Sequence, residues 1–362
     1  MAEWPRVTIV TPSYNQAEFL EETIRSVLLQ GYPNLEYIIV DGASRDGSVD
    51  IIRRYERWLT WWVSEPDEGQ SDAINKGFRR ASGEIIAWIN SDDYYAPGAI
   101  HAAVKTLSAH PEAAMVYGDY AIVDEHSRLV STSLERDRYR TFDFETLLNV
   151  RDFIFQPTVF MRHQVLRELG YLDTRLHYAM DYDLWLRIGE RYPVIHAPRQ
   201  ILAYYRRHSA AKTTLPSFAL MREKVMLSRR HGGNGPSAVR YLVEHRWDML
   251  LDDSPTRTPA VLLEDMASEG FQSLDAATQQ MARQIFWEIA YREACIAHAD
   301  HDVGRMKAWL SAALSTDPAR SLTTPGILSR IIEGWMGPAP LSAYRKVKRK
   351  VTHLVLAGHP RK

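Results

Sequence analysis

The sequence predicts an α/β fold for its first part and a mainly helical region for the rest. Short runs of β-branched and aromatic residues alternate with helical patterns over the first third of the 362 residues, and this succession is typical of a largely parallel sheet. Strand signals fade from Pro216, where helical patterns with glycine and proline breaks take over. The length also favours two units, since a typical domain has roughly 100–200 residues.

Four short runs in the first 90 residues predict strands, at residues 7–11, 35–41, 61–64 and 85–89. The last run is entirely apolar and is expected at the centre of the sheet. Apolar residues from Phe19 to Leu28 recur at helical spacing until Gly31 stops the pattern, so this helix should pack on the sheet. Further strands are expected at residues 115–117 and, at an edge of the sheet, 201–206.

Composition limits the class of protein. No apolar run approaches the roughly 18 residues that suggest a spanning helix, and the first residues lack the pattern of a signal peptide. The single cysteine, Cys295, excludes an internal disulfide and a cysteine-cluster zinc site. These features predict a cytoplasmic protein.

The formal net charge of -1 conceals an uneven distribution. Residues 341–362 carry seven Lys or Arg and no Asp or Glu, which leaves 37 basic and 45 acidic side chains elsewhere. That acidic body argues against nucleic-acid binding. Apolar residues mark one helical face of the tail, so we expect a basic amphipathic helix that can contact an anionic membrane. A helix docked on the protein and a disordered tail are the alternatives.

Two adjacent carboxylates, Asp92 and Asp93, lie in a turn directly after the most apolar strand. Their mutual repulsion is relieved by a hard divalent cation, which can also bridge to phosphate oxygens. Ligands of open α/β sheets bind beyond the carboxyl ends of strands, which is where this turn is expected. A solvated turn or a helix N-cap is the alternative.

A second polar group lies on a predicted helix. Asp72, Asn75 and Lys76 stand at i, i+3 and i+4, near one face of the first turns of a helix that Ser71 or Asp72 would cap. Such a face can bind a polyanion. The alternative is a capped surface helix with a solvated face.

Five short motifs, in their order along the chain, resemble those of the family 2 glycosyltransferases, which have the nucleotide-binding GT-A fold. They are residues 11–15, 40–48, 67–69, 72–77 and 90–93. The similarity continues through residues 156–158, 170–173, 181–187 and 204–208, and so covers roughly residues 5–213. It implies a GT-A domain with a Rossmann-like sheet at residues 1–215, followed by a helical region at 216–340 and the basic tail at 341–362.

The resemblance also implies roles for single residues on the donor's side. Pro12, Ser13 and Tyr14 correspond to the loop beneath the donor's nucleotide, and Asp41 to the acid that reads the base. The helical residues Asp72, Asn75 and Lys76 correspond to positions around the base and diphosphate.

A metal site is implied as well. Asn90, Ser91 and Asp92 align with the family's Asp-x-Asp motif, whose second acid binds Mn²⁺ or Mg²⁺, although Asn90 stands where the first Asp is usual. Asp92 is thus the first implied metal ligand, with Asp93 as its neighbour or substitute. His208 corresponds to a histidine that can reach the metal or diphosphate, while a structural histidine is the alternative.

Asp181 aligns with the acid of the family's Glu-Asp motif that deprotonates the acceptor, and Met180 stands in place of the Glu. Inverting transfer needs one base to take the hydroxyl proton while the oxygen attacks the anomeric carbon opposite the departing diphosphate. The alternative for Asp181 is an N-cap ahead of a helix at residues 182–190.

The resemblance therefore implies an inverting glycosyltransferase that moves a sugar from a UDP-, dTDP- or GDP-sugar to a glycan or lipid-linked acceptor, in polysaccharide or cell-surface glycan assembly. A sugar-nucleotide-forming transferase should instead show a Gly-rich phosphate loop after the first strand, and residues 12–15 are not such a loop. A catalytically inactive module that recruits partners through its helical region is the alternative from another class.

Overall fold

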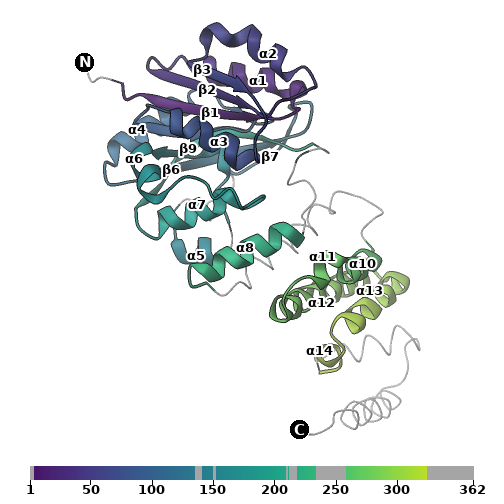
Figure 1. Cartoon of the computed structure of the whole chain (residues 1–362). Coiled ribbons are helices and arrows are strands. Elements are labelled where there is room, and N and C mark those ends of the chain that lie inside the picture. The colour runs from purple at the N-terminus through teal and green to yellow at the C-terminus, as the bar shows by residue number, and fades with distance from the viewer. Residues whose placement is uncertain are drawn as a thin grey trace, which may run out of the picture. The chain divides into compact units, whose positions relative to one another are not determined.

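The computed structural model describes residues 4–134, 141–149, 152–208, 211, 218–233 and 258–323 (Figure 1). The chain forms two compact units, one of Met1–Leu215 with Glu223–Asn234 and one of Pro216–Arg222 with Gly235–Lys362. The three-part division inferred from the sequence stays a prediction, and the basic tail at 341–362 lies outside the described residues.

Four parallel strands make up one half of the sheet in the first unit. They lie in the order β3 (Trp61–Ser64), β2 (Leu35–Asp41), β1 (Val7–Ser13) and β4 (Ile85–Trp88). All four strands were predicted, and the central place of β4 is confirmed, since four further strands follow it in the sheet order. The register pairs Ser13 with Asp41 and Asp41 with Ser64, so these three strands end at one edge.

The other half of the sheet mixes directions, so the prediction of a largely parallel sheet holds only for the first four strands. The chain of partners after β4 is β8 (Phe160–Arg162), β6 (Met115–Val123), β9 (Val194–Arg206) and β5 (Tyr94–Tyr95), and β7 (Leu129–Thr132) pairs with β6. Only β6 and β9 are parallel here. The prediction of an edge strand at 201–206 was wrong, because β5 continues the sheet and pairs Tyr94 with Tyr204.

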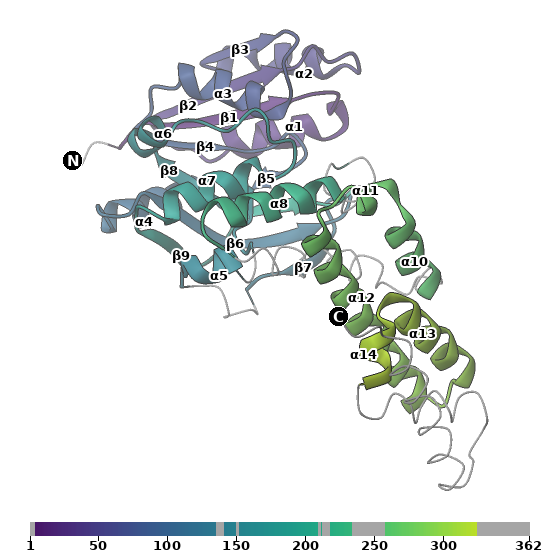
Figure 2. The ribbon, with the colours of Figure 1, turned by 60° about the horizontal axis from the view of Figure 1, so that its bottom comes forward.

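Helices pack on both faces of the sheet (Figure 2). Alternate residues of β1, β2 and β4, such as Val7 and Ile9, share a core with α1 (Ala17–Leu28), α2 (Ser48–Tyr55) and α4 (Ala99–Ala109). Trp88 faces the other way, with its ring 5.9 Å from Phe78 of α3 (Gln70–Arg80) and 5.6 Å from Trp185 of α7 (Met180–Gly189). The period of two along each strand thus directs side chains to two buried faces.

Helix α3 lies unusually close to the sheet. A methyl group on Gly77 would come within 2.4 Å of Val10 Cγ1, so only glycine permits this approach to β1. The N-cap of the helix is Gly69, whose φ of +112° suits glycine, so the prediction that Ser71 or Asp72 caps it was wrong. Asp72 instead accepts a hydrogen bond from the backbone N–H of Glu68, 3.2 Å away.

Several shorter elements and one further helix complete the first unit. They are the 3₁₀ turns η1 (Glu56–Trp58) and η3 (Gln156–Thr158) and the helices α5 (Phe144–Asn149), α6 (His163–Leu169) and α8 (Phe218–Arg230), of which α8 also enters the second unit.

The described part of the second unit is helical, as predicted. Its helices are α10 (Pro259–Ala267), α11 (Glu269–Gln272), α12 (Ala276–Ala299), α13 (Val303–Thr316) and α14 (Pro318–Thr323). Helices α12 and α13 pack together, and Asp275 and Asp302 cap their N-termini. In the parts of the chain described above, no helix combines the length and hydropathy that a membrane span needs.

Candidate active site

The loops that follow the parallel strands are joined to one another by hydrogen bonds. The backbone N–H of Gly42 donates to the Ser13 carbonyl at 2.8 Å, which links the ends of β1 and β2. The Ser64 hydroxyl donates to Asp41 Oδ2 at 2.7 Å, which links β2 to β3. The ends of these strands therefore form one continuous polar edge, where open α/β sheets bind their ligands.

Asp41 is fully buried within this edge. Besides Ser64, its carboxylate accepts hydrogen bonds from the Ser44 backbone N–H at 2.9 Å and the Ser44 hydroxyl at 2.6 Å. These contacts hold the loop after β2 in shape. The base-reading role predicted for Asp41 gains no support from them, because both carboxylate oxygens already bind protein groups.

Tyr14 and Asp67 flank Gly42. A methyl group on Gly42 would lie 2.6 Å from Asp67 Oδ2 and 3.2 Å from the Tyr14 ring, and Tyr14 is 64% exposed. From the sequence, Asp67 was expected only in a turn, although it lies in one of the motifs that carry the resemblance. Of the other predicted residues here, Pro12 and Ser13 are buried in β1.

The polar residues predicted to share a face of α3 separate into two groups. Lys76 Nζ lies 3.1 Å from Glu65 Oε1 and 3.4 Å from Asp72 Oδ2. Partial burial opposes protonation, but the hydrogen bond to Glu65 and the charge of Asp72 raise the pKa of Lys76. Lys76 thus remains a cation beside the strand ends.

Asn75 turns away from this group. Its amide is buried, donates to the Leu172 carbonyl at 2.9 Å and accepts from the Leu172 N–H at 3.0 Å. Both polar ends of the side chain are therefore occupied by one backbone unit. These contacts favour a structural role for Asn75 over the predicted contact with a nucleotide.

The turn after β4 brings two predicted residues together. Asp92 Oδ2 lies 3.1 Å from His208 Nε2, although 116 positions separate them in the chain. The His208 ring is mostly buried and packs against the Phe19 ring, with the two ring centres 4.6 Å apart. In the same turn, Asn90 Oδ1 accepts a hydrogen bond from Gln70 Nε2 at 2.8 Å, a partner that the sequence had not suggested.

Asp93 points into the protein, in contrast to Asp92. It is buried, and its Oδ1 accepts from the Arg206 backbone N–H at 2.9 Å. Burial and the charge of Asp92 raise the pKa of Asp93 well above its usual range. These contacts favour a structural role over the predicted metal role. Ser91 is buried as well, and its carbonyl accepts from the Thr23 hydroxyl.

The pair of Asp92 and His208 fits a divalent cation. A carboxylate oxygen and an imidazole nitrogen are both ligands of Mn²⁺, and Mg²⁺ or Mn²⁺ at phosphate sites often takes only one or two protein ligands. Within the ranges that the structure describes, no group of three or more His, Cys, Asp or Glu side chains could hold a metal by itself. A cation at this pair would therefore need further oxygens, such as those of a diphosphate.

Asp181 lies in the first turn of α7, and the alternative of an N-cap was wrong because Ala179 occupies that position. The carboxylate is half-buried, and its Oδ1 accepts from the Tyr182 N–H at 2.8 Å. Burial and the charge of Asp152 raise the pKa of Asp181 to about 6, while Lys224 acts in the opposite direction. Neither Asp152 nor Lys224 was a candidate from the sequence.

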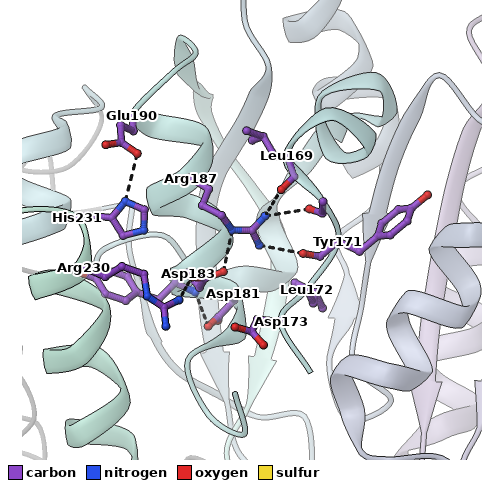
Figure 3. Close-up of polar contacts among 12 residues, drawn as sticks. Leu169, Tyr171, Leu172, Asp173, Asp181, Asp183, Arg187, Glu190, Arg230 and His231 are labelled. Atoms are coloured by element: carbon purple, nitrogen blue, oxygen red, sulfur yellow. Dashed lines mark hydrogen bonds and ion pairs between the residues drawn. The ribbon is translucent and has the colours of Figure 1, made fainter. Parts of the chain in front are cut away.

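Arg187 ties α7 to the segment before it (Figure 3). Its Nε donates to Asp183 Oδ2 at 2.8 Å, and its two terminal nitrogens donate to the carbonyls of Leu169, Gly170 and Tyr171 at 2.9 to 3.0 Å. The next residue, Leu172, is the one that Asn75 of α3 binds. A continuous set of hydrogen bonds therefore connects the helix that carries Asp181 to α3.

A family model described as Glycosyl transferase family 2 matches residues 8–170. An uncharacterized glycosyltransferase of Mycobacterium tuberculosis is 34% identical over 192 residues, which cover 52% of this chain and 70% of that protein. The chain belongs to glycosyl transferase family 2.

Other relatives of this family 2 glycosyltransferase match over part of their length. An uncharacterized glycosyltransferase of Rickettsia typhi is 28% identical over 212 residues, which cover 58% of this chain and 66% of the relative. TuaG of Bacillus subtilis, whose name includes teichuronic acid biosynthesis, is 41% identical over 97 residues, or 26% of this chain and 38% of TuaG.

Solved structures confirm the GT-A fold of this family 2 glycosyltransferase. Residues 1–349 of Staphylococcus aureus TarS, in complex with UDP-GlcNAc, match with a TM-score of 0.53 at 14% identity, covering 86% of this chain and 92% of that one. The mannosyltransferase PcManGT of Pyrobaculum calidifontis, with GDP-Man and Mn²⁺, matches with a TM-score of 0.54 at 22% identity, covering 88% of each chain.

Proposed function

We propose that this family 2 glycosyltransferase transfers a sugar, with inversion, from a nucleotide-diphosphate sugar to an acceptor hydroxyl. The observation that carries the proposal is the pair of Asp92 and His208, 3.1 Å apart beyond the central strand β4. Such a pair suits the diphosphate end of a donor with its cation. The exposed ring of Tyr14, beside Asp67, supports placing the nucleoside end over the loops after β1 and β2.

Asp181 is the proposed base. It takes the proton of the acceptor hydroxyl while that oxygen forms a bond to the anomeric carbon and the bond from this carbon to the diphosphate breaks on the opposite face. A pKa of about 6 suits this role, because the carboxylate is mostly charged at pH 7 yet more basic than a solvated aspartate.

Charge on the leaving diphosphate needs stabilisation during this transfer. Asp92 and His208 are the proposed holders of a divalent cation, Mn²⁺ or Mg²⁺, which when bound there neutralises part of that charge. Lys76 adds a cation near the same edge and is held by Glu65 and Asp72. Asp93 is left out of the ligand set because its side chain is buried and its Oδ1 accepts from the Arg206 backbone N–H.

The donor and the pathway are proposed from the relatives. TarS is solved with UDP-GlcNAc and PcManGT with GDP-Man and Mn²⁺, so UDP, dTDP and GDP sugars are the donors to test. The name of TuaG supports a role in polysaccharide or cell-surface glycan assembly, with a glycan or lipid-linked acceptor. A cytoplasmic location, with contact to the inner membrane face through residues 341–362, stays part of the proposal.

A catalytically inactive binding module is the second candidate, favoured by the substitutions at positions 90 and 180. Two observations weaken this second candidate. Met180 is buried, so this side chain belongs to the core rather than to an exposed acidic pair, and Asn90 keeps a polar contact through Gln70. In an inactive module, Asp92→Asn and Asp181→Asn would leave the binding of partners unchanged.

Calorimetric titration of the full chain with UDP, dTDP and GDP, with and without Mn²⁺, tests the proposal. We expect one nucleotide to bind more tightly with Mn²⁺. In Asp92→Asn, the affinity for that nucleotide in the presence of Mn²⁺ should fall at least about tenfold, because one of the two protein ligands loses its charge. Asp50→Asn, at a side chain 81% exposed, is the matched control. Absence of binding by all three nucleotides would refute the proposal.

A further inference from the structure

Helix α8 holds the backbone that leads into α7. Glu223 Oε1 accepts from the His177 N–H at 2.9 Å, and Oε2 accepts from the N–H groups of Tyr178 and Ala179 at 2.8 and 2.9 Å. Ala179 is the N-cap of α7, and Asp181 follows two residues later. The position of the candidate base is therefore fixed in part by a side chain of α8.

The next residue of α8 forms an ion pair beside Asp181. Lys224 Nζ lies 2.7 Å from Asp152 Oδ2, and both side chains are nearly buried. Lys224 Nζ also lies 5.2 Å from the centre of the ring of Tyr182, the neighbour of Asp181. An ion pair shielded from water acts on nearby charges far more strongly than a surface pair does.

We propose that Lys224 and Asp152 are positioning residues for Asp181, and that their ion pair sets the charge balance under which this carboxylate accepts a proton. The inference rests on the proposed function, in which Asp181 is the base. It assigns to α8, which lies beyond residues 8–170, a part in the active centre. No motif that carries the family resemblance includes Lys224 or Asp152.

The two charges of the pair act on Asp181 in opposite directions. Asp152 raises the pKa of Asp181 and Lys224 lowers it, while the burial of Asp181 adds to the effect of Asp152. Without Lys224, burial and Asp152 together would keep Asp181 protonated closer to neutral pH, where it could not serve as a base. Without Asp152, the carboxylate would be charged but a weaker base.

Other charged groups near Asp181 already have partners. Glu223 binds three backbone N–H groups ahead of α7. Asp183, one residue beyond Tyr182, pairs with Arg187 at 2.8 Å and with Arg230 at 3.6 Å. A substitution of Lys224 or Asp152 can therefore change the charge around Asp181 while Glu223 and Arg187 still hold α7 in place.

The test is a pH titration of aspartate carboxyl carbons by ¹³C NMR on the full chain, with the Asp181 signal assigned by its loss in Asp181→Asn. We expect Lys224→Met to raise the pKa of Asp181, and Asp152→Asn to lower it, each by about one unit. The double variant should fall between the two, because both opposing charges are gone. Lys224→Arg keeps the charge and should restore a titration near that of the wild type.

Matched controls are Lys105→Met and Asp50→Asn, which remove exposed charges elsewhere in the same unit and should leave Asp181 unmoved. An Asp181 titration unchanged in both single variants would overturn the inference. If Lys224→Met fails to fold, the pKa of Asp181 in Asp152→Asn and in the double variant Lys224→Met/Asp152→Asn tests the inference. The double variant leaves no unpaired buried charge.

A second measurement separates this inference from the proposed function. The rate of nucleotide release from the donor selected by the calorimetric screen is followed against pH, and its acidic limb should move with the Asp181 titration in each variant. Full turnover in Asp181→Asn would refute the base role while the coupling of the three residues could still be seen by NMR. If the pKa of Asp181 stays unchanged in the Lys224 and Asp152 variants while Asp181→Asn abolishes turnover, the coupling is refuted and the proposed function is left intact.

Discussion

Two regions of the first unit are built in different ways. The strand-end region, which comprises residues 12–15, 41–44, 64–76, 90–93 and 208, is assembled mainly by the parallel strands, whose register brings their carboxyl ends together. The α7 region, which comprises Asp152, residues 169–190 and residues 223–231, is assembled by side chains that bind backbone groups and ions across long gaps in the chain.

Under the proposed function, this difference separates the binding of the donor from the transfer step. The strand-end region follows from the sheet, so a local motif is enough to place its residues. The α7 region depends on Arg187, Glu223 and Lys224, and none of these acts through its neighbours in sequence alone. We therefore expect substitutions in the first region to alter nucleotide binding, and substitutions in the second to alter turnover and stability.

The largest expected effect is that of Asp181→Asn on turnover. Loss of the proposed base should slow nucleotide release from the donor in the presence of acceptor by about 10³-fold, the usual contribution of general base catalysis. Binding of the nucleotide should stay within about twofold of the wild type, because the strand-end region is intact. Calorimetry and a turnover assay check the two halves. Equal loss of binding and turnover would break the distinction between the two regions.

Much of the strand-end region could be predicted from the sequence. Asp92 and His208 were candidates, and the structure brings them together because β5, just after Asp92, pairs with the end of β9, just before His208. The directions of Asn75 and Asp93 could not be predicted, since a polar residue can face a ligand or a backbone amide with the same spacing. The two-residue strand β5 was too short to give a signal, which made β9 look like an edge.

Beyond Asp181 and the helix that carries it, little of the α7 region could be predicted in the same way. Asp183 and Arg187 stand at i, i+4, which suggests a pair on one helix, but the three carbonyls that Arg187 also binds leave no mark in the sequence. Lys224 and Asp152 are 72 positions apart, and α8 gave only a general helical pattern. Contacts of this kind depend on how helices pack, which the periodicity of one segment does not encode.

The second effect in size is that of Arg187→Met on stability. Removing the guanidinium leaves three carbonyls without this donor and leaves Asp183, almost fully buried, with only the more distant Arg230. We expect a loss of about 2 to 4 kcal/mol in the free energy of unfolding, measured with urea. Arg175→Met, at a side chain 81% exposed, should cost less than about 0.5 kcal/mol. Equal costs would mean that Arg187 does not secure the α7 region.

The smallest expected effect is that of Asp181→Asn on the free energy of unfolding, because a carboxylate with a raised pKa destabilises the folded state when it is charged. The folded-state pKa of Asp181 is about 6, and an unfolded aspartate has a pKa of about 3.9. Because the folded value is higher, the folded state binds the proton more tightly, and its stability falls as pH rises from about 4 to about 6 and stays reduced above that. Asn carries no charge, so Asp181→Asn should be more stable than the wild type at pH 8.

The gain expected for Asp181→Asn at pH 8 is about 1 to 2 kcal/mol, below the full value of the shift because the carboxylate is partly exposed. The gain should shrink as pH falls through 6 and vanish below about pH 3, where Asp181 is protonated in both states. Urea unfolding at several pH values measures it, with Asp50→Asn as the control that gains nothing. A variant less stable than the wild type at pH 8 would mean that the surroundings of Asp181 stabilise its charge, which contradicts a raised pKa.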